Sequence, residues 1–310
     1  MFRETGTVPE VTMIIDCHAH VARHLSGFWQ PLRFGKVSDR GQIRQLLPPS
    51  FDPPASPPEA LLGYMDQAGV DRTYLVQHYW YGDQNKTVLD ALRQWPDRFR
   101  GFAYLGSMDQ ADAPDQLERL IEAGMTGLKV EVVSTRRLRP TFRFDGTPER
   151  KVWERLNQLK RPLVLDINDA TPDDVHALHA LIEELDNVRF LICHVGGAAR
   201  DGWKERAMVA RHPRAWVDIS AVPMAFGMEQ EYPYRQSQEV VRWAVETFGG
   251  DRVLWGTDYP PALNYGTYLQ LLDFARRHCD FLTPDQRSAL LGGNAEDFLS
   301  TSATNHPATP

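Results

Sequence analysis

The sequence predicts a single-domain (β/α)8 barrel (TIM barrel), and three observations support this. Short runs rich in β-branched residues alternate with longer stretches of helical periodicity, a pattern typical of a parallel sheet covered by helices. Eight such runs follow one another along the chain. No glycine-rich phosphate loop follows the first run, which disfavours the open doubly wound sheet that the same alternation would also allow.

The eight strands are expected where apolar, β-branched runs are bounded by turn residues. In chain order they occupy residues 12–21, 72–79, 99–106, 126–133, 162–168, 189–197, 215–220 and 252–260. The segments between them carry helix signals. Thr171 and Pro172 are typical of the first turn of a helix, and Gly124 and Gly249 of helix ends.

Two segments depart from this alternation. Residues 23–58 form a long excursion after the first strand, rich in proline and aromatic residues, and we expect a lid or substrate wall there, or an oligomer contact. Residues 300–310 lack core-forming side chains and are expected to be disordered. The barrel is therefore assigned to residues 12–299.

Composition narrows the class of function. The chain has 310 residues, 42% hydrophobic and 24% charged, with a net charge of -7 that argues against a nucleic-acid surface. No stretch approaches the roughly 20 apolar residues of a membrane span, and no signal-type run precedes the first strand. Three scattered cysteines are too few for a disulfide framework. We expect a cytoplasmic protein that acts on a small molecule, without a nucleic-acid or membrane partner.

Polar residues interrupt the strands near their carboxyl ends, where (β/α)8 barrels build their active sites. By alternation, Asp16, His18 and His20 share one face of the first strand, so the two imidazoles can converge on one ion or substrate. A purely structural histidine pair is disfavoured because buried histidines need partners. His194 and Asp258 end the sixth and eighth strands before Gly or Pro turns. An Asp at a strand end can also be a turn former, but its occurrence with three histidines favours function.

The strand 1, 6 and 8 motifs of amidohydrolase-related family 2 resemble three segments of this chain, IIDCHAH, LICHVGG and LWGTDYP. PDRFRGFAYL and GNAEDFL also resemble family segments, so the similarity extends over residues 12–299. The family includes aminocarboxymuconate semialdehyde decarboxylase. The resemblance implies one divalent metal, zinc foremost and manganese second, bound by His18, His20 and Asp258. It also implies that His194 and Asp258 move protons in catalysis.

The sequence departs from the family pattern at strand 5, where Asp166 stands in place of the usual histidine ligand. A carboxylate also binds zinc or manganese, so Asp166 is a candidate ligand. Glu131 on strand 4 is a second candidate ligand or base, although an internal ion pair with Lys129 is an alternative. A site without metal, as in the pyrone dicarboxylate lactonase among the relatives, remains open.

Substrate contacts are expected from the residues that follow strands 2 and 4. His78, Tyr79, Trp80 and Tyr81 would give an aromatic wall for a ring-sized substrate, and Arg136 would clamp a carboxylate. The alternatives are ordinary packing for His78 and a solvated basic loop for Arg136.

The resulting functional hypothesis is a hydrolase that cleaves a C–O or C–N bond of a lactone, ester or amide of a small organic acid, using metal-activated water. Three alternatives stay open: a metal-dependent non-oxidative decarboxylase of an aromatic or unsaturated acid, a metal-independent lactonase, and a non-catalytic scaffold. The hydrolase is preferred over the decarboxylase because Asp166 replaces a histidine that helps to complete the decarboxylase metal site. A homodimer is possible.

Overall fold

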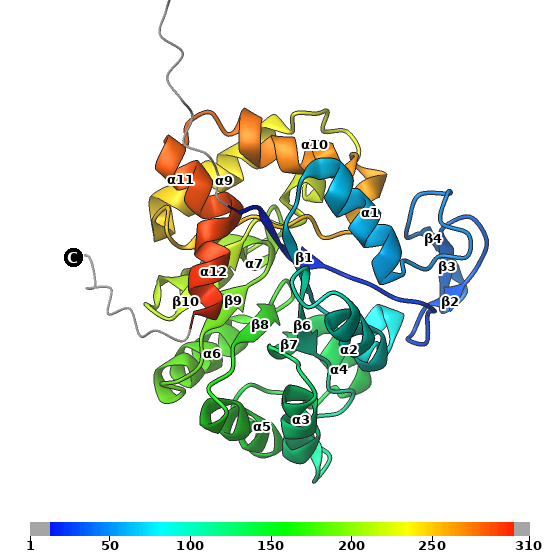
Figure 1. Ribbon diagram of the computed structural model, residues 1–310. Helices are drawn as coiled ribbons and strands as arrows, with labels where there is room; N and C mark the ends of the chain where they lie inside the picture. The colour runs from blue at the N-terminus through cyan, green and yellow to red at the C-terminus, as the bar shows by residue number, and fades with distance from the viewer. Residues whose placement is uncertain (1–12, 301–310) are drawn as a thin grey trace, which may run out of the picture.

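The computed structural model describes residues 13–300, and these residues form the predicted barrel (Figure 1). Each predicted strand is present in a shorter form. The eight barrel strands are β1 (Ile15–Ala19), β5 (Arg72–Leu75), β6 (Phe99–Ala103), β7 (Gly127–Glu131), β8 (Leu163–Asp166), β9 (Phe190–Ile192), β10 (Ala215–Asp218) and β11 (Val253–Leu254). All neighbouring pairs are parallel, in the order β1-β5-β6-β7-β8-β9-β10-β11.

Backbone hydrogen bonds between β1 and the segment after β11 close the sheet into a barrel. The Cys17 amide donates to the Trp255 carbonyl at 3.0 Å, and the His20 amide donates to the Tyr259 carbonyl at 2.7 Å. Gly256 lies in this seam, where an added Cβ atom would meet the His18 Cβ at 3.0 Å. A residue without a side chain therefore allows β1 to approach closely just where the two histidines begin.

Helices surround the barrel and follow the strands in alternation, as Figure 1 shows. The longer ones have amphipathic sequences whose apolar residues face the sheet. The helices of the described residues are α1 (Pro58–Ala68), α2 (Asn85–Gln94), α3 (Ala113–Glu122), α4 (Val132–Leu138), α5 (Thr147–Gln158), α6 (Pro172–Glu184), α7 (His194–Gly197), α8 (Trp203–Ala207), α9 (Arg235–Phe248), α10 (Tyr268–Asp273), α11 (Pro284–Ser288) and α12 (Asn294–Leu299).

The predicted helix signals at α6 and α9 are confirmed. The Thr171 hydroxyl accepts a hydrogen bond from the Asp174 amide, and the Asp174 carboxylate accepts from the Thr171 amide in a capping box. Gly249, with φ 94°, follows the last residue of α9, where a side chain would be strained. Among the described residues no helix is long and apolar enough to span a bilayer.

A separate apolar cluster fills the interior of the barrel, and α12 forms a plug at one end of it. Residues such as Tyr74, Phe102 and Trp216 fill it from the strands, and Phe298 of α12 joins it from outside the sheet. The Tyr74 hydroxyl donates to the Ala295 carbonyl at 2.6 Å, which fixes α12 to the strands. The polar side chains cluster at the carboxyl ends of the strands, whereas α12 closes the opposite end of the barrel. The end that carries the polar side chains therefore stays open.

The excursion after β1 is more structured than a loop. It contains β2 (Gln30–Pro31), β3 (Lys36–Asp39) and β4 (Gln42–Gln45), which form a three-stranded antiparallel sheet beside the barrel (Figure 1). Its strands are short and mostly exposed, so they lack the long apolar alternation that would have predicted them. Its predicted role as a lid stays a prediction. The tail predicted to be disordered lies outside the described residues, except for Ser300.

We expect Phe298→Ala to lower the free energy of unfolding by about 3–5 kcal/mol, because it opens a cavity in the barrel plug. Phe298 is fully buried, with its ring centroid 5.7 Å from that of Trp216. Urea unfolding would measure the loss. Leu269→Ala on α10 is the control, since Leu269 is 41% exposed and its truncation should cost little. Equal effects of the two substitutions would contradict the role of α12 as a plug.

Candidate active site

A β-bulge in β1 brings His18 and His20 into the barrel mouth. Asp16 pairs with Thr73 and Ala19 with Leu75, so β1 has one residue more than β5 between these pairs. The predicted common face of His18 and His20 is confirmed, since both line the same cavity. The prediction that Asp16 shares this face is wrong, because the extra residue shifts the alternation.

Asp16 instead supports the site from behind. Its carboxylate accepts hydrogen bonds from the Thr257 hydroxyl at 2.6 Å and from the Tyr268 hydroxyl of α10 at 2.8 Å. Burial raises the pKa of Asp16 to about 6, against the opposing effect of these hydrogen bonds. Asp16 therefore ties β1 to the segment that carries Asp258, without facing the mouth itself.

Asp218 at the end of β10 orients His18 and His194. Its Oδ2 lies 3.1 Å from His18 Nδ1, and its Oδ1 accepts from the His194 amide at 2.9 Å. Burial lowers the pKa of His18 to about 4, although the Asp218 charge opposes this, so the imidazole is neutral. A proton on Nδ1 donates to Asp218 and leaves the Nε2 lone pair directed toward the mouth. Asp218 was not predicted from the sequence, in which its one signal is an aspartate within the apolar run AWVDIS.

His20 and Asp258 face each other across the seam of the barrel. His20 Nδ1 lies 2.8 Å from the Val76 carbonyl oxygen, which only accepts, so Nδ1 carries a proton. Burial lowers the pKa of His20, which favours the neutral ring with an unprotonated Nε2. That atom lies 2.8 Å from Asp258 Oδ1, and His18 Nε2 lies 3.7 Å from the same oxygen.

These three side chains suit a metal ion. One donor atom from each of His18, His20 and Asp258 lies within 4.8 Å of the others. Two imidazole lone pairs and a carboxylate oxygen repel one another unless a cation or a proton lies among them. Two nitrogens and one oxygen are also a donor set that zinc accepts, with further coordination positions left open. The residues present therefore fit the divalent metal that the resemblance implies.

His194 faces this group across the mouth. Its Nδ1 donates to the Ser220 carbonyl at 2.9 Å, and its Nε2 lies 3.6 Å from Asp166 Oδ2. Burial by itself would lower the pKa of His194, but the negative charge of Asp166 outweighs burial and raises the pKa to about 9. His194 is consequently a protonated donor at neutral pH, held in place by Ser220 and paired with Asp166.

Strained backbone accompanies two of these residues. His194 has φ 57° and Asp258 has φ 63°, in the left-handed region that residues other than glycine rarely adopt. Such conformations cost on the order of 1–3 kcal/mol each and concentrate at functional sites. The surrounding hydrogen bonds, including the one from the Asp258 amide to the His18 carbonyl at 2.8 Å, hold the strained geometry.

The two further candidate ligands, Asp166 and Glu131, lie outside the converging group. Asp166 Oδ1 accepts from the Asn168 amide at 3.0 Å, while Oδ2 faces His194. Glu131 Oε1 lies 3.1 Å from His78 Nε2, and Glu131 Oε2 accepts from the Ser134 hydroxyl. Both carboxylates are thus engaged with other partners, and their assignment as ligands remains a prediction.

Lys129 points into the barrel, and its ammonium group contacts Cys193. Lys129 Nζ lies 2.9 Å from Cys193 Sγ, and both side chains are buried. Burial raises the pKa of the Cys193 thiol well above its usual range, so the thiol stays protonated. Cys193 also lies close to His18 and Asp218, but a protonated thiol is a poor metal ligand.

The cavity at the mouth has a volume of about 420 Å³, a size that suits a small organic molecule. His18, His20, His194 and Asp258 line its floor together with Asp166 and Glu131. The predicted wall residues His78, Trp80 and Tyr81 line it, and they are joined by Trp29, which was not predicted from the sequence to lie there. Trp29 stacks on Trp80 with ring centroids 4.4 Å apart, so the excursion after β1 supplies part of the wall.

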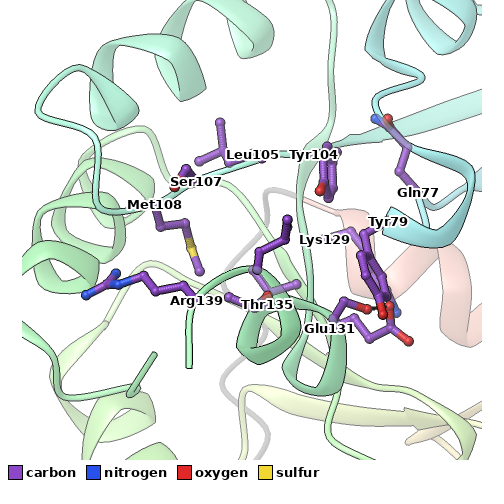
Figure 2. Close-up of a pocket in the computed structure, with 14 residues that line it drawn as sticks. Gln77, Tyr79, Tyr104, Leu105, Ser107, Met108, Lys129, Glu131, Thr135 and Arg139 are labelled. Atoms are coloured by element: carbon purple, nitrogen blue, oxygen red, sulfur yellow. Dashed lines mark hydrogen bonds between the residues drawn. The ribbon is translucent and has the colours of Figure 1, made fainter. Parts of the chain in front are cut away.

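Two of the predicted substrate contacts, Tyr79 and Arg136, do not line this cavity. Tyr79 lines a separate, smaller cavity of about 20 Å³, where Figure 2 shows it beside Glu131. That volume accommodates about one water molecule and no substrate. Arg136 lines neither cavity, and its guanidinium binds Asp174 at the start of α6. The structure therefore gives no support to the prediction that Arg136 clamps a substrate, because its guanidinium donates to the buried Asp174 carboxylate outside the cavity.

A model of the Amidohydrolase family matches residues 15–301. The chain belongs to the amidohydrolase family. One curated relative is the L-fucono-1,5-lactonase of Burkholderia ambifaria, 28% identical over 138 residues, or 41% of this chain and 47% of the lactonase. Another is the 4-sulfomuconolactone hydrolase of Hydrogenophaga intermedia, 25% identical over 227 residues, or 68% and 67% of the two chains. The match thus spans about half the length of the lactonase.

Solved amidohydrolase structures share the fold. A probable 2-pyrone-4,6-dicarboxylic acid hydrolase from Acinetobacter baumannii, with citric acid bound, has a TM-score of 0.69 at 17% identity, covering 92% of this chain and 98% of the other. A Burkholderia multivorans amidohydrolase with bound zinc has a TM-score of 0.70 at 15% identity, covering 93% and 99%. A Novosphingobium aromaticivorans 5-carboxyvanillate decarboxylase with manganese has a TM-score of 0.56 at 16% identity, covering 77% and 79%.

We expect Asp218→Ala to lower the free energy of unfolding by about 3 kcal/mol or more, because it leaves several buried donors, among them His18 Nδ1 and the His194 amide, without a partner. Chemical denaturation would measure the change. Asp186→Ala, at an exposed position, is the matched control. If both variants are as stable as the parent, Asp218 does not organise the site.

Proposed function

We propose that this amidohydrolase hydrolyses a C–O or C–N bond in a lactone, ester or amide of a small organic acid. The observation that carries the proposal is the arrangement of His18, His20 and Asp258 opposite a protonated His194 in one cavity. Hydrolysis needs a group that accepts a proton from water and a donor for the oxygen on which negative charge develops. The cavity supplies both.

His18, His20 and Asp258 are the residues that would hold one divalent ion, zinc foremost and manganese second. Such an ion would act as a Lewis acid toward the scissile carbonyl. Asp218 and the Val76 carbonyl hold the proton-bearing Nδ1 atoms of the two histidines, which keeps both Nε2 lone pairs available. Solved amidohydrolases with zinc and with manganese support the choice of metals.

Asp258 is proposed as the general base. Burial by itself would raise the pKa of its carboxyl, but the neighbouring histidines, among them the protonated His194, outweigh burial and hold the pKa below the usual value, so the group is ionised at neutral pH. It accepts the proton of the attacking water and can pass it to the leaving group. His194, protonated and paired with Asp166, donates to the carbonyl oxygen as charge develops there.

Several features favour hydrolysis over the alternatives. Both curated relatives are named as lactone-hydrolysing enzymes. The solved decarboxylase is covered to 79%, whereas the solved pyrone dicarboxylic acid hydrolase is covered to 98%. Decarboxylation of an unsaturated acid is the second candidate, because it would use the same floor of the cavity. A scaffold without activity would not need three converging donor side chains, nor strained backbone at Asp258 and His194.

We expect Asp258→Asn to lower kcat by about 10²–10⁴-fold because the amide cannot accept the proton of water. Circular dichroism and the denaturation midpoint would show whether the fold is retained. Asp186→Asn removes an equal charge from the exposed surface and should retain the parent kcat. Near-parental turnover by Asp258→Asn would remove Asp258 from the role of base.

We expect Asp166→Asn to lower kcat by about tenfold or more, through weaker support of the protonated His194, while the bound metal per chain stays unchanged. The two readouts separate a partner of His194 from a metal ligand. Loss of metal from Asp166→Asn would place Asp166 in the coordination sphere instead.

A further inference from the structure

Three buried polar side-chain atoms in the lining of the cavity have no hydrogen-bond partner within residues 13–300. They are Trp29 Nε1, the Tyr81 hydroxyl and Asn168 Oδ1. Of these three residues only Tyr81 is buried as a whole, with 3% of its surface exposed. A buried hydroxyl that makes no hydrogen bond destabilises a folded chain, and such groups often serve a ligand or a reaction. The Tyr81 hydroxyl therefore needs a partner that residues 13–300 do not supply.

The Tyr81 ring lies in a fixed place beside the candidate metal site. Its centroid is 5.8 Å from that of His20 and 5.8 Å from that of His78, and the Trp29 ring meets it edge-on at 6.3 Å. The Tyr81 backbone carbonyl accepts a hydrogen bond from the Ser26 amide at 2.8 Å. The neighbouring rings and this backbone contact hold the phenol next to His20.

The charges that act on the hydroxyl place it toward the centre of the mouth. The carboxylates among them are those of Asp258 and Glu131, and both line the cavity. Asp258 follows β11 and Glu131 ends β7, four strands away in the eight-stranded order, so the two carboxylates come from opposite sides of the barrel. Burial, reinforced by these charges, raises the pKa of Tyr81 well above its usual value. The hydroxyl thus keeps its proton and is a hydrogen-bond donor.

The proposed hydrolysis has one atom that still lacks a donor. Asp258 accepts the proton of the attacking water, and His194 donates to the carbonyl oxygen. The leaving oxygen or nitrogen also gains negative charge as its bond to the acyl carbon breaks, and a donor aimed at that charge speeds the reaction. His194 follows β9 and Tyr81 follows β5, so the two donors come from opposite sides of the mouth. A carbonyl oxygen bound by His194 leaves Tyr81 on the far side of the reacting carbon.

We propose that Tyr81 is a further catalytic residue, whose hydroxyl donates a hydrogen bond to the leaving atom of the substrate. The inference rests on the proposed hydrolase function and adds a residue to it. Water adds its oxygen to the acyl carbon, and the C–O or C–N bond breaks with its electron pair on the leaving atom. That atom receives the proton that Asp258 took from water. Tyr81 stabilises the charge on the leaving atom before this proton arrives, and keeps its own proton.

Esters that share one acyl group and differ in the leaving alcohol test the inference. The leaving oxygen becomes more basic, and needs a donor more, from 4-nitrophenyl acetate through phenyl acetate to ethyl acetate. We expect Tyr81→Phe to lower kcat/KM about 100-fold for ethyl acetate and for δ-valerolactone, which also has an alkoxide leaving group, but no more than about threefold for 4-nitrophenyl acetate. Titration of the released acid by the metal-loaded protein would measure each rate.

Stability gives a second readout that does not depend on turnover. A hydroxyl without a partner contributes nothing to the fold, so Tyr81→Phe should have a urea midpoint equal to that of the parent or above it. A lower midpoint would show that the hydroxyl has a structural partner, and would overturn the inference.

Tyr104→Phe is the matched control. It removes the same group from a tyrosine that lines the small cavity of Figure 2 and not the mouth. The ratio of kcat/KM between ethyl acetate and 4-nitrophenyl acetate should therefore equal that of the parent.

The remaining outcomes separate this inference from the proposed function. An equal loss on every ester in Tyr81→Phe, or no loss on any, would overturn the inference and leave the hydrolase proposal intact. Hydrolysis of 4-nitrophenyl acetate alone by the parent would also overturn it, because a site with a donor for the leaving atom should act on alkoxide leaving groups. If the metal-loaded parent hydrolyses none of the three acetates and no lactone, the proposed function fails, and the inference fails with it.

Discussion

The candidate site depends on one buried carboxylate, that of Asp218. It is fully buried and contacts His18 Nδ1 and the His194 amide, while the Ser220 amide and hydroxyl also donate to it. A buried charge is tolerated only where hydrogen-bond donors compensate for its lost hydration. The Asp218 carboxylate therefore fixes the positions of the groups that donate to it. The direction of the His18 lone pair and the position of the strained backbone at His194 follow from this requirement.

The barrel could be predicted from the sequence because its eight strands and its longer helices carry local signals. The capping pattern at Thr171 and the apolar run of β8 needed no tertiary information. The small sheet β2–β4 was missed because its short, exposed strands are stabilised mainly by one another. The sequence identified His18, His20, His194 and Asp258 by their places at strand ends. It could not show the bulge that turns Asp16 outward, since the bulge arises from pairing with β5.

The same limit applies to partners that are distant in sequence. Asp218 meets His18 across 200 positions, and Arg136 meets Asp174 across 38. Residue type and spacing suggested a carboxylate clamp at Arg136, but only the folded chain reveals that a buried aspartate occupies it. Trp29 and Trp80 stack on each other at the wall of the cavity, whereas His18, His20 and Asp258 converge at its floor. Chemistry at the floor and selectivity at the tryptophan wall are therefore set by different residues, as is common in barrels of this kind.

The proposed hydrolysis depends most on a single catalytic metal ion, which we propose that His18, His20 and Asp258 hold. Elemental analysis of the purified protein, with lactone turnover measured before and after chelation and after re-addition of zinc or manganese, tests this directly. We expect about one equivalent of metal per chain, activity that is lost on chelation and restored by the ion, and loss of metal in the double variant His18→Ala/His20→Ala. Full turnover in metal-free, chelator-treated protein would contradict the account and favour acid–base catalysis by the same side chains alone.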